Sequence, residues 1–185
     1  MRPVPLHWNR VKARTCTLRD KAMDEYRITI AKNQISFAAA HFIAYGSGRC
    51  ENLHGHNYRI GAVFAGALDQ YHLLVDFVRL KRELEVIADR LDHRMLLATE
   101  SAALPVVKTP DGEIEVRLAD RRYVFPEGDV MLVDIPNTTA EMLAVWIVDR
   151  LMEQLGSDAQ RLTWMEVEVE ESPGQSATCR RDFRT

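Results

Sequence analysis

The sequence has few cysteines and no long apolar run. Its three cysteines are Cys16, Cys50 and Cys179, and no Cys-x-x-Cys pair occurs. They are too few and too scattered for a disulfide framework, which is typical of a protein in a reducing compartment. The apolar runs are far shorter than a membrane span, and no hydrophobic region of a signal peptide is present. We therefore expect a cytoplasmic protein without a membrane partner.

The sequence also lacks an excess of charge of one sign. It carries 24 Lys and Arg residues against 27 Asp and Glu residues, for a net charge of -3 and a pI near 6.1. We therefore expect no nucleic-acid partner, and an anionic ligand would have to be held by local charge. With 185 residues, 46% hydrophobic and 28% charged, the protein is expected to form one globular domain with a sizeable core.

Three histidines and one cysteine lie within the segment from His41 to His56. His54 and His56 are separated by one glycine, so on a β-strand their side chains would point to the same face. Alternation over residues 26–37 predicts a preceding strand, whose antiparallel pairing would bring His41 beside them. Three imidazoles with an open fourth position are typical of catalytic Zn²⁺. The alternative is that these are ordinary surface or core histidines.

Cys50 stands four residues before His54, in a loop that contains Gly46 and Gly48. A nearby cation lowers the pKa of a thiol and favours the reactive thiolate. We interpret Cys50 as a proton-transfer residue. The alternatives are a small buried hydrophobic residue or a fourth zinc ligand.

The rest of the sequence predicts an α+β domain with a four-stranded antiparallel sheet and two helices packed on one face. Asp76 is a good N-cap for a first helix with apolar residues at helical spacing. Thr138 or Thr139 would cap a second helix, which Gly156 ends. The order is β-β-α-β-α-β, with strands expected at residues 26–37, 57–65, 129–135 and 161–170.

The domain is expected to span residues 26–172, with one segment on either side of it and one inserted within it. Residues 1–25 form a basic extension and residues 173–185 form a polar tail, and both are expected to be loosely packed. Residues 100–128 contain the turn signal Thr109-Pro-Asp-Gly112 and predict one or two inserted hairpins. We expect the insert to be a surface extension or an oligomer contact.

The pattern Cys50-x-x-x-His54-Gly-His56, with Phe37-x-x-x-His41 upstream, resembles the family of 6-pyruvoyl-tetrahydropterin and 6-carboxy-tetrahydropterin synthases. The Cys-to-His spacing is more similar to the carboxy branch. The resemblance runs from about residue 26 to residue 171. Further motifs follow in the family's order, namely Val75-Asp76-Phe77, Leu91-Asp92-His93, Thr139-Ala140-Glu141 and Glu170-Glu171-Ser172.

The resemblance implies a tunnelling fold (T-fold), a homo-hexamer of stacked trimers with sites at subunit contacts, and a pterin triphosphate substrate. It implies Zn²⁺ on His41, His54 and His56. Asp92 and His93 would form a dyad that acts with Cys50, although some relatives use a glutamate in place of the cysteine and Glu51 follows it directly. Glu171 would bind the pterin, with Glu170 as the alternative. The residues implied to frame the pterin pocket are Thr139, Ala140 and Glu141.

Three functions remain open at this point. The first is the carboxy-forming enzyme of 7-deazaguanine (queuosine) biosynthesis, which converts 7,8-dihydroneopterin triphosphate to 6-carboxy-5,6,7,8-tetrahydropterin with release of triphosphate and acetaldehyde. The second is the pyruvoyl-forming enzyme of tetrahydrobiopterin synthesis, or a relative serving folate synthesis. The third is a non-catalytic zinc-binding homologue.

Overall fold

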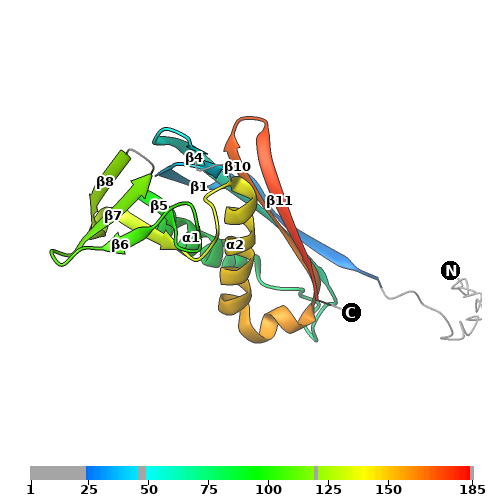
Figure 1. Cartoon of the computed structure of the whole chain (residues 1–185). Helices are drawn as coiled ribbons and strands as arrows, with labels where there is room; N and C mark the ends of the chain where they lie inside the picture. The colour runs from blue at the N-terminus through cyan, green and yellow to red at the C-terminus, as the bar shows by residue number, and fades with distance from the viewer. Residues whose placement is uncertain (1–23, 46–48, 119–120, 184–185) are drawn as a thin grey trace, which may run out of the picture.

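Figure 1 shows the computed structural model of the protein, which describes residues 24–45, 49–118 and 121–183. The N-terminal extension expected at residues 1–25 lies outside these residues except for its last two. In the part of the chain that is described, no helix combines the length and the apolar character needed to cross a membrane.

One mixed sheet forms the centre of the fold. Four of its strands pair antiparallel, whereas β5 pairs with β1 and β9 with β5 in parallel. In spatial order the six strands are β11 (Gln175–Asp182), β10 (Leu162–Ser172), β4 (His54–Gly66), β1 (Tyr26–His41), β5 (Arg94–Ala98) and β9 (Val130–Val133). The α+β class and the T-fold are confirmed, but the sheet has two strands more than the four predicted.

The first additional strand, β5, follows the first helix almost directly. Its apolar run Met95-Leu-Leu-Ala98 is made of good helix formers, and a short apolar run cannot be assigned from periodicity alone. The helix ends at Asp92, whose backbone is extended, and the next residue, His93, has a φ of +54°, a conformation that L-residues rarely adopt. No glycine or proline marks this break in the sequence.

The second additional strand, β11, corrects the expectation of a loose C-terminal tail. The chain turns at Gly174, with a φ of +83°, and then pairs antiparallel with β10 from Gln175 to Asp182. Polar residues dominate β11 because it is an edge strand with one face in water. Its inward residues Ala177 and Cys179 are small, yet they pack against the core.

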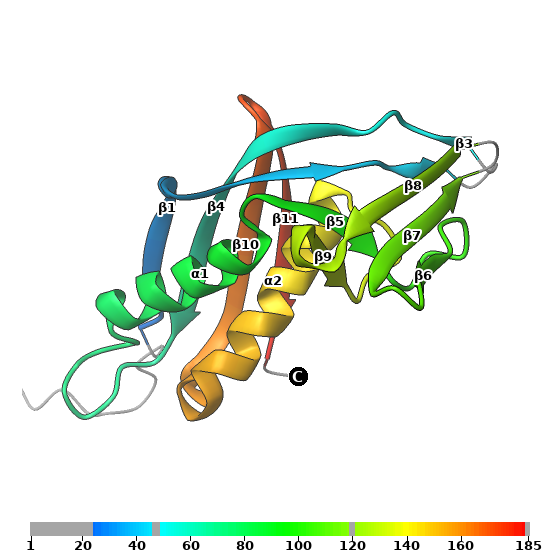
Figure 2. The same cartoon turned by 90° about the vertical axis from the view of Figure 1, so that its left-hand side faces the viewer.

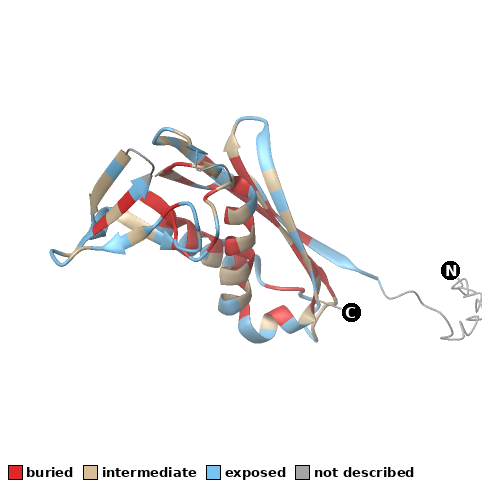
Figure 3. Ribbon diagram, viewed as in Figure 1, coloured by how far each residue is buried: buried red, intermediate tan, exposed pale blue. Residues whose placement is uncertain are grey.

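Two helices cover one face of the sheet, as predicted, and the buried residues lie between these two layers (Figure 3). Helix α1 (Phe77–Leu91) begins at Asp76, whose side chain accepts a hydrogen bond from the backbone N–H of Val78. Helix α2 (Ala140–Leu155) begins in the same way at Thr139 and ends at Gly156. Short 3-10 turns at Glu127–Asp129 and Gly156–Arg161 precede β9 and β10.

The insert is a small antiparallel sheet of three strands, which form two successive hairpins, where one or two hairpins were expected. Its strands are β6 (Val106–Lys108), β7 (Glu113–Leu118) and β8 (Arg121–Pro126). Figure 2 shows it beside the ends of β1 and β4, where β2 (Ala44–Tyr45) and β3 (Arg49–Cys50) form a two-stranded ribbon. A second hydrophobic core joins the insert to the main sheet through Phe42, Met95, Leu97, Leu104, Ile114 and Val116.

Candidate metal centre and active site

The pairing of β1 with β4 brings the three histidines together. His41, the last residue of β1, stands opposite His54, the first residue of β4, and His56 projects from the same face two residues later. Gly55 points the other way, and a Cβ atom there would lie 2.9 Å from the carbonyl oxygen of Ala39. The pattern His-Gly-His therefore places two imidazoles on one face of β4 and no side chain on the other, where the backbone of β1 lies close.

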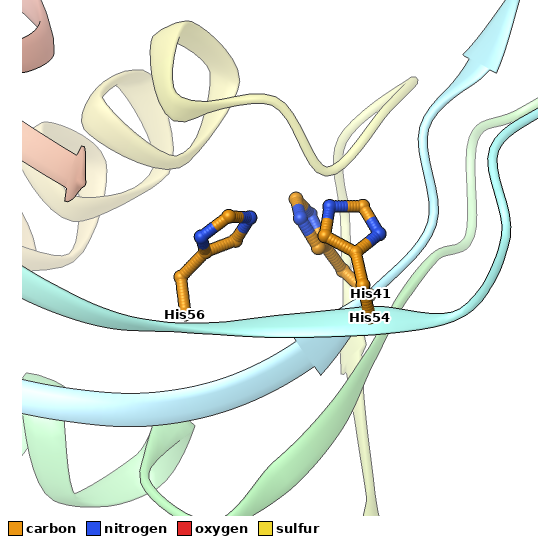
Figure 4. Close-up of side chains that lie close together, drawn as sticks. All are labelled: His41, His54 and His56. Carbon is orange, nitrogen blue, oxygen red and sulfur yellow. The ribbon is translucent and has the colours of Figure 1, made fainter.

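The ligand atoms of His41, His54 and His56 all lie within 4.8 Å of one another, so this group could hold a metal ion (Figure 4). His41 is buried, and His54 and His56 are partly exposed. Burial lowers the pKa of His41 and keeps its imidazole neutral at pH 7, which is the form that binds metals. The expected juxtaposition of the three histidines is confirmed.

Two of these imidazoles are oriented by backbone carbonyls. Nδ1 of His41 lies 2.9 Å from the carbonyl oxygen of Thr138, and Nδ1 of His54 lies 2.8 Å from that of Asn52. A carbonyl oxygen only accepts hydrogen bonds, so Nδ1 carries the proton in both rings and Nε2 is left as the ligand atom. This donor set fits a metal ion such as zinc.

Glu171 connects the histidines to a cavity of about 370 Å³. Its Oε1 atom lies 3.5 Å from Nε2 of His41 and 3.7 Å from Nε2 of His56, and it accepts a hydrogen bond from the hydroxyl of Tyr58. The cavity is also lined by Thr139, Ala140 and Glu141 from the start of α2. The structure thus brings together the four residues that were expected to bind substrate.

Glu170 faces the opposite side of β10. Its carboxylate pairs with Lys32 at 2.5 Å and with Arg59 at 3.0 Å. Both partners hold the pKa of Glu170 below its usual value, Lys32 more strongly. Of the two neighbouring glutamates, Glu171 is the one that lies at the histidines.

Cys50 lies on β3, and its side chain packs partly against the second hydrophobic core. Burial raises the pKa of its thiol, and the charge of Arg121 opposes this shift. Its sulfur is not part of the group of ligand atoms formed by the three histidines. Among the residues that the structure describes, no hydrogen bond joins the thiol to Asp92 or His93.

Asp92 and His93 do form the expected dyad. Nδ1 of His93 donates to Oδ2 of Asp92 at 2.7 Å, and Oδ1 of Asp92 accepts from the backbone N–H of Ala38 at 2.7 Å. These hydrogen bonds, with that of Ala38 the stronger influence, lower the pKa of Asp92. The His93 side chain is 82% exposed, so within one chain the imidazole faces solvent rather than Cys50.

Glu51 was expected only in connection with the glutamate that some relatives use in place of the cysteine. Its Oε2 atom lies 3.6 Å from Nε2 of His54, and its Oε1 atom accepts a hydrogen bond from the hydroxyl of Tyr45. Tyr45 also lines the cavity that contains Glu171. The only signal in the sequence was the position of Glu51 directly after Cys50.

The fold and this site define a protein of the T-fold class with a three-histidine centre beside a ligand-sized cavity. Residues 29–182 match the model of the family described as 6-pyruvoyl tetrahydropterin synthase. The chain therefore belongs to this family, and it is an enzyme of the tetrahydropterin synthase type.

Individual relatives agree with this assignment. A protein of Methanocaldococcus jannaschii, provisionally named 6-carboxy-5,6,7,8-tetrahydropterin synthase, is 29% identical over 80% of this chain and 90% of its own length. The Bacillus subtilis protein of that name is 28% identical over 83% of this chain and 85% of its own.

Among solved structures, the 6-pyruvoyl tetrahydropterin synthase of Plasmodium vivax superposes with a TM-score of 0.80. It is 29% identical, and the match covers 86% of this chain and 99% of that chain. Further structures of the P. vivax protein carry alanine or cysteine in place of a glutamate that is described as a catalytic residue of that enzyme.

Proposed function

We propose that this protein is a zinc-dependent lyase that converts 7,8-dihydroneopterin triphosphate to 6-carboxy-5,6,7,8-tetrahydropterin. The reaction consumes one water molecule and releases triphosphate and acetaldehyde, and it would serve 7-deazaguanine (queuosine) biosynthesis. The observation that carries the proposal is the His41, His54 and His56 group, which Glu171 joins to a cavity of about 370 Å³. A cavity of this volume lies in the range of small-molecule sites.

Each residue of the site has a role in this proposal. Zn²⁺ held by the three histidines would supply Lewis acidity that makes the C–H bonds of the substrate's side chain acidic. Glu171 binds the guanidine-like edge of the pterin, because a carboxylate accepts two parallel N–H hydrogen bonds there. The hydroxyl of Tyr58 orients that carboxylate. Thr139, Ala140 and Glu141 frame the pterin at the N-terminus of α2.

Cys50 accepts the proton from the substrate carbon, and Asp92 and His93 carry the complementary proton transfer. In the dyad the carboxylate of Asp92 orients the imidazole of His93 for proton transfer. Because the His93 side chain is exposed, another copy of the chain could contact the dyad.

The protein is also proposed to be cytoplasmic, which the free thiols of Cys50 and Cys179 support.

The site is proposed to be completed in a homo-hexamer, a dimer of trimers. In the described part of the protein β11 and β9 each pair with one neighbour, so both edges of the six-stranded sheet are open to another chain. We expect light scattering at micromolar concentration to give a mass six times that of the 21.2 kDa chain. A stable monomer with full turnover would contradict a shared site.

A second candidate function is the formation of the 6-pyruvoyl compound from the same substrate. It is favoured by the similarity to the P. vivax enzyme and by Glu51, whose carboxylate approaches His54 at 3.6 Å. The two reactions share the loss of triphosphate and differ in whether the carbon side chain is cleaved.

The experiment that tests the proposal is incubation of the metal-loaded protein with 7,8-dihydroneopterin triphosphate. We expect release of triphosphate and acetaldehyde in equal amounts, each measured by a coupled assay. Protein treated with a chelator is the control and should release neither. Triphosphate without acetaldehyde would favour the pyruvoyl reaction, and release of neither product by metal-loaded protein would contradict both.

A further inference from the structure

An arginine of the insert is hydrogen-bonded to residues 50–52, which form the end of β3 and the loop before β4. Arg121 is the first residue of β8, and its Nη2 atom donates to the carbonyl oxygen of Cys50 at 3.0 Å. Its Nη1 atom lies 3.0 Å from Oδ1 of Asn52 and 3.4 Å from the carbonyl oxygen of Glu51. One guanidinium thus contacts acceptors on three consecutive residues, an arrangement that its planar set of donors allows and a lysine cannot reproduce.

The same loop orients a histidine of the metal centre. The carbonyl oxygen of Asn52, whose side chain Arg121 holds, accepts the Nδ1–H of His54 at 2.8 Å. On the other side of the loop, the backbone N–H of Glu51 donates to the carbonyl oxygen of Ile43. Arg121 is therefore connected to the ring of His54 through one residue.

The insert gives Arg121 a fixed base. Ile114 and Val116 of β7 are buried in the second hydrophobic core together with Phe42, which directly follows His41. The ring of Tyr123 on β8 packs against Phe42 with centroids 5.5 Å apart. The insert is thus packed against the end of β1 and bonded to the loop before β4, the two segments that supply His41 and His54.

We propose that Arg121 is a positioning residue of the metal centre, through which the insert holds residues 50–52 so that His54 keeps its orientation toward the metal. The expected effect of Arg121 on turnover rests on the function proposed above. The insert then has a part in the active site and is more than a surface extension. Arg121 itself touches none of the three histidines in the described structure, so it acts through Asn52.

The next residue supplies a matched control. Arg122 donates to Oε2 of Glu115 at 2.9 and 2.6 Å, within the insert, and in the described structure it makes no hydrogen bond to residues 50–52. Arg121→Ala and Arg122→Ala therefore remove the same charge and the same side-chain volume from one strand. A loss caused by general loosening of the insert would appear in both variants.

The test compares metal affinity and turnover in the full-length variants. Affinity for Zn²⁺ is measured by competition with a chromophoric chelator, and the visible spectrum of the Co²⁺-loaded protein reports the geometry around the ion. Partners of metal-binding histidines typically contribute about 10- to 100-fold to metal affinity. Arg121 is one residue further from the ring than such a partner, so we expect Arg121→Ala to weaken Zn²⁺ binding by the lower end of that range, about tenfold. The same variant should lower kcat more than it changes KM and should alter the Co²⁺ spectrum.

Arg122→Ala should leave all three measurements within about twofold of the wild type, and Arg121→Lys should restore part of the affinity through one of the lost hydrogen bonds. Wild-type affinity and an unchanged Co²⁺ spectrum in Arg121→Ala would overturn the proposal, and so would equal losses in the two alanine variants. If the wild type binds Zn²⁺ but turns over no pterin, the proposed function fails while the affinity comparison still decides the role of Arg121.

Discussion

Replacing His56 with alanine should remove the metal ion and abolish turnover. Two imidazoles are fewer ligands than catalytic zinc sites use, so the ion is no longer held. The Lewis acidity of a bound metal contributes several kcal/mol to a transition state, so its loss should lower kcat by roughly a thousandfold or more. Metal content is measured by elemental analysis, with about one ion per chain expected for the wild type, one per three-histidine group.

His56 is the best position for this test because its side chain is 24% exposed. His41 is buried completely, and its truncation would also leave a cavity that destabilises the fold. His72→Ala is the matched control, since His72 is exposed and lies on the loop before α1. That variant should keep full metal content and activity. A His56→Ala protein with one ion per chain would show that the metal centre is wrongly assigned.

Replacing Cys50 with alanine should have a large effect on turnover and none on metal content. A positioned group that transfers a proton contributes about 10²- to 10⁴-fold, so kcat should fall within that range. The sulfur stands outside the group of histidine ligand atoms, so elemental analysis should still find the ion. Cys179→Ala, in which the cysteine of β11 is removed, should behave as the wild type.

Glu51→Gln is the variant to compare with Cys50→Ala. Glutamine keeps the shape of the side chain but cannot accept a proton at neutral pH, and Glu51 lies beside His54. If Cys50 accepts the proton, Cys50→Ala should lose more activity than Glu51→Gln. The reverse order would assign the proton transfer to Glu51, and loss of metal from Cys50→Ala would make Cys50 a ligand.

The histidine site was predictable because its signals are local. The period of two along a strand places His54 and His56 on one face, and the pairing of two alternating segments then brings in His41. The N-cap Asp76 and the terminating Gly156 were equally predictable, and the second N-cap was narrowed to Thr138 or Thr139, since a cap needs only the residues next to it. These signals do not depend on the tertiary packing of the rest of the protein.

The sequence alone did not determine which of Glu170 and Glu171 lies at the histidines. Neighbouring residues on a strand point to opposite faces, so a shift of one residue exchanges their surroundings. The pairing of β10 with β11 is irregular between Glu170 and Ser172. Only the packing of β10 beneath α2 places Glu171 at the histidines and Glu170 at Lys32 and Arg59.

Spacing along one or two adjacent segments was enough to predict the α+β class, the start of both helices, the end of the second helix, and the three histidines. The entry of β5 and β11 into the sheet depended instead on tertiary packing, since a short apolar run and a polar edge strand acquire their role from their neighbours. The same holds for the contact of Arg121 with residues 50–52, which lie about 70 positions earlier. No local pattern encodes a hydrogen bond of that separation, because it exists only once two hydrophobic cores have brought the insert and the loop together.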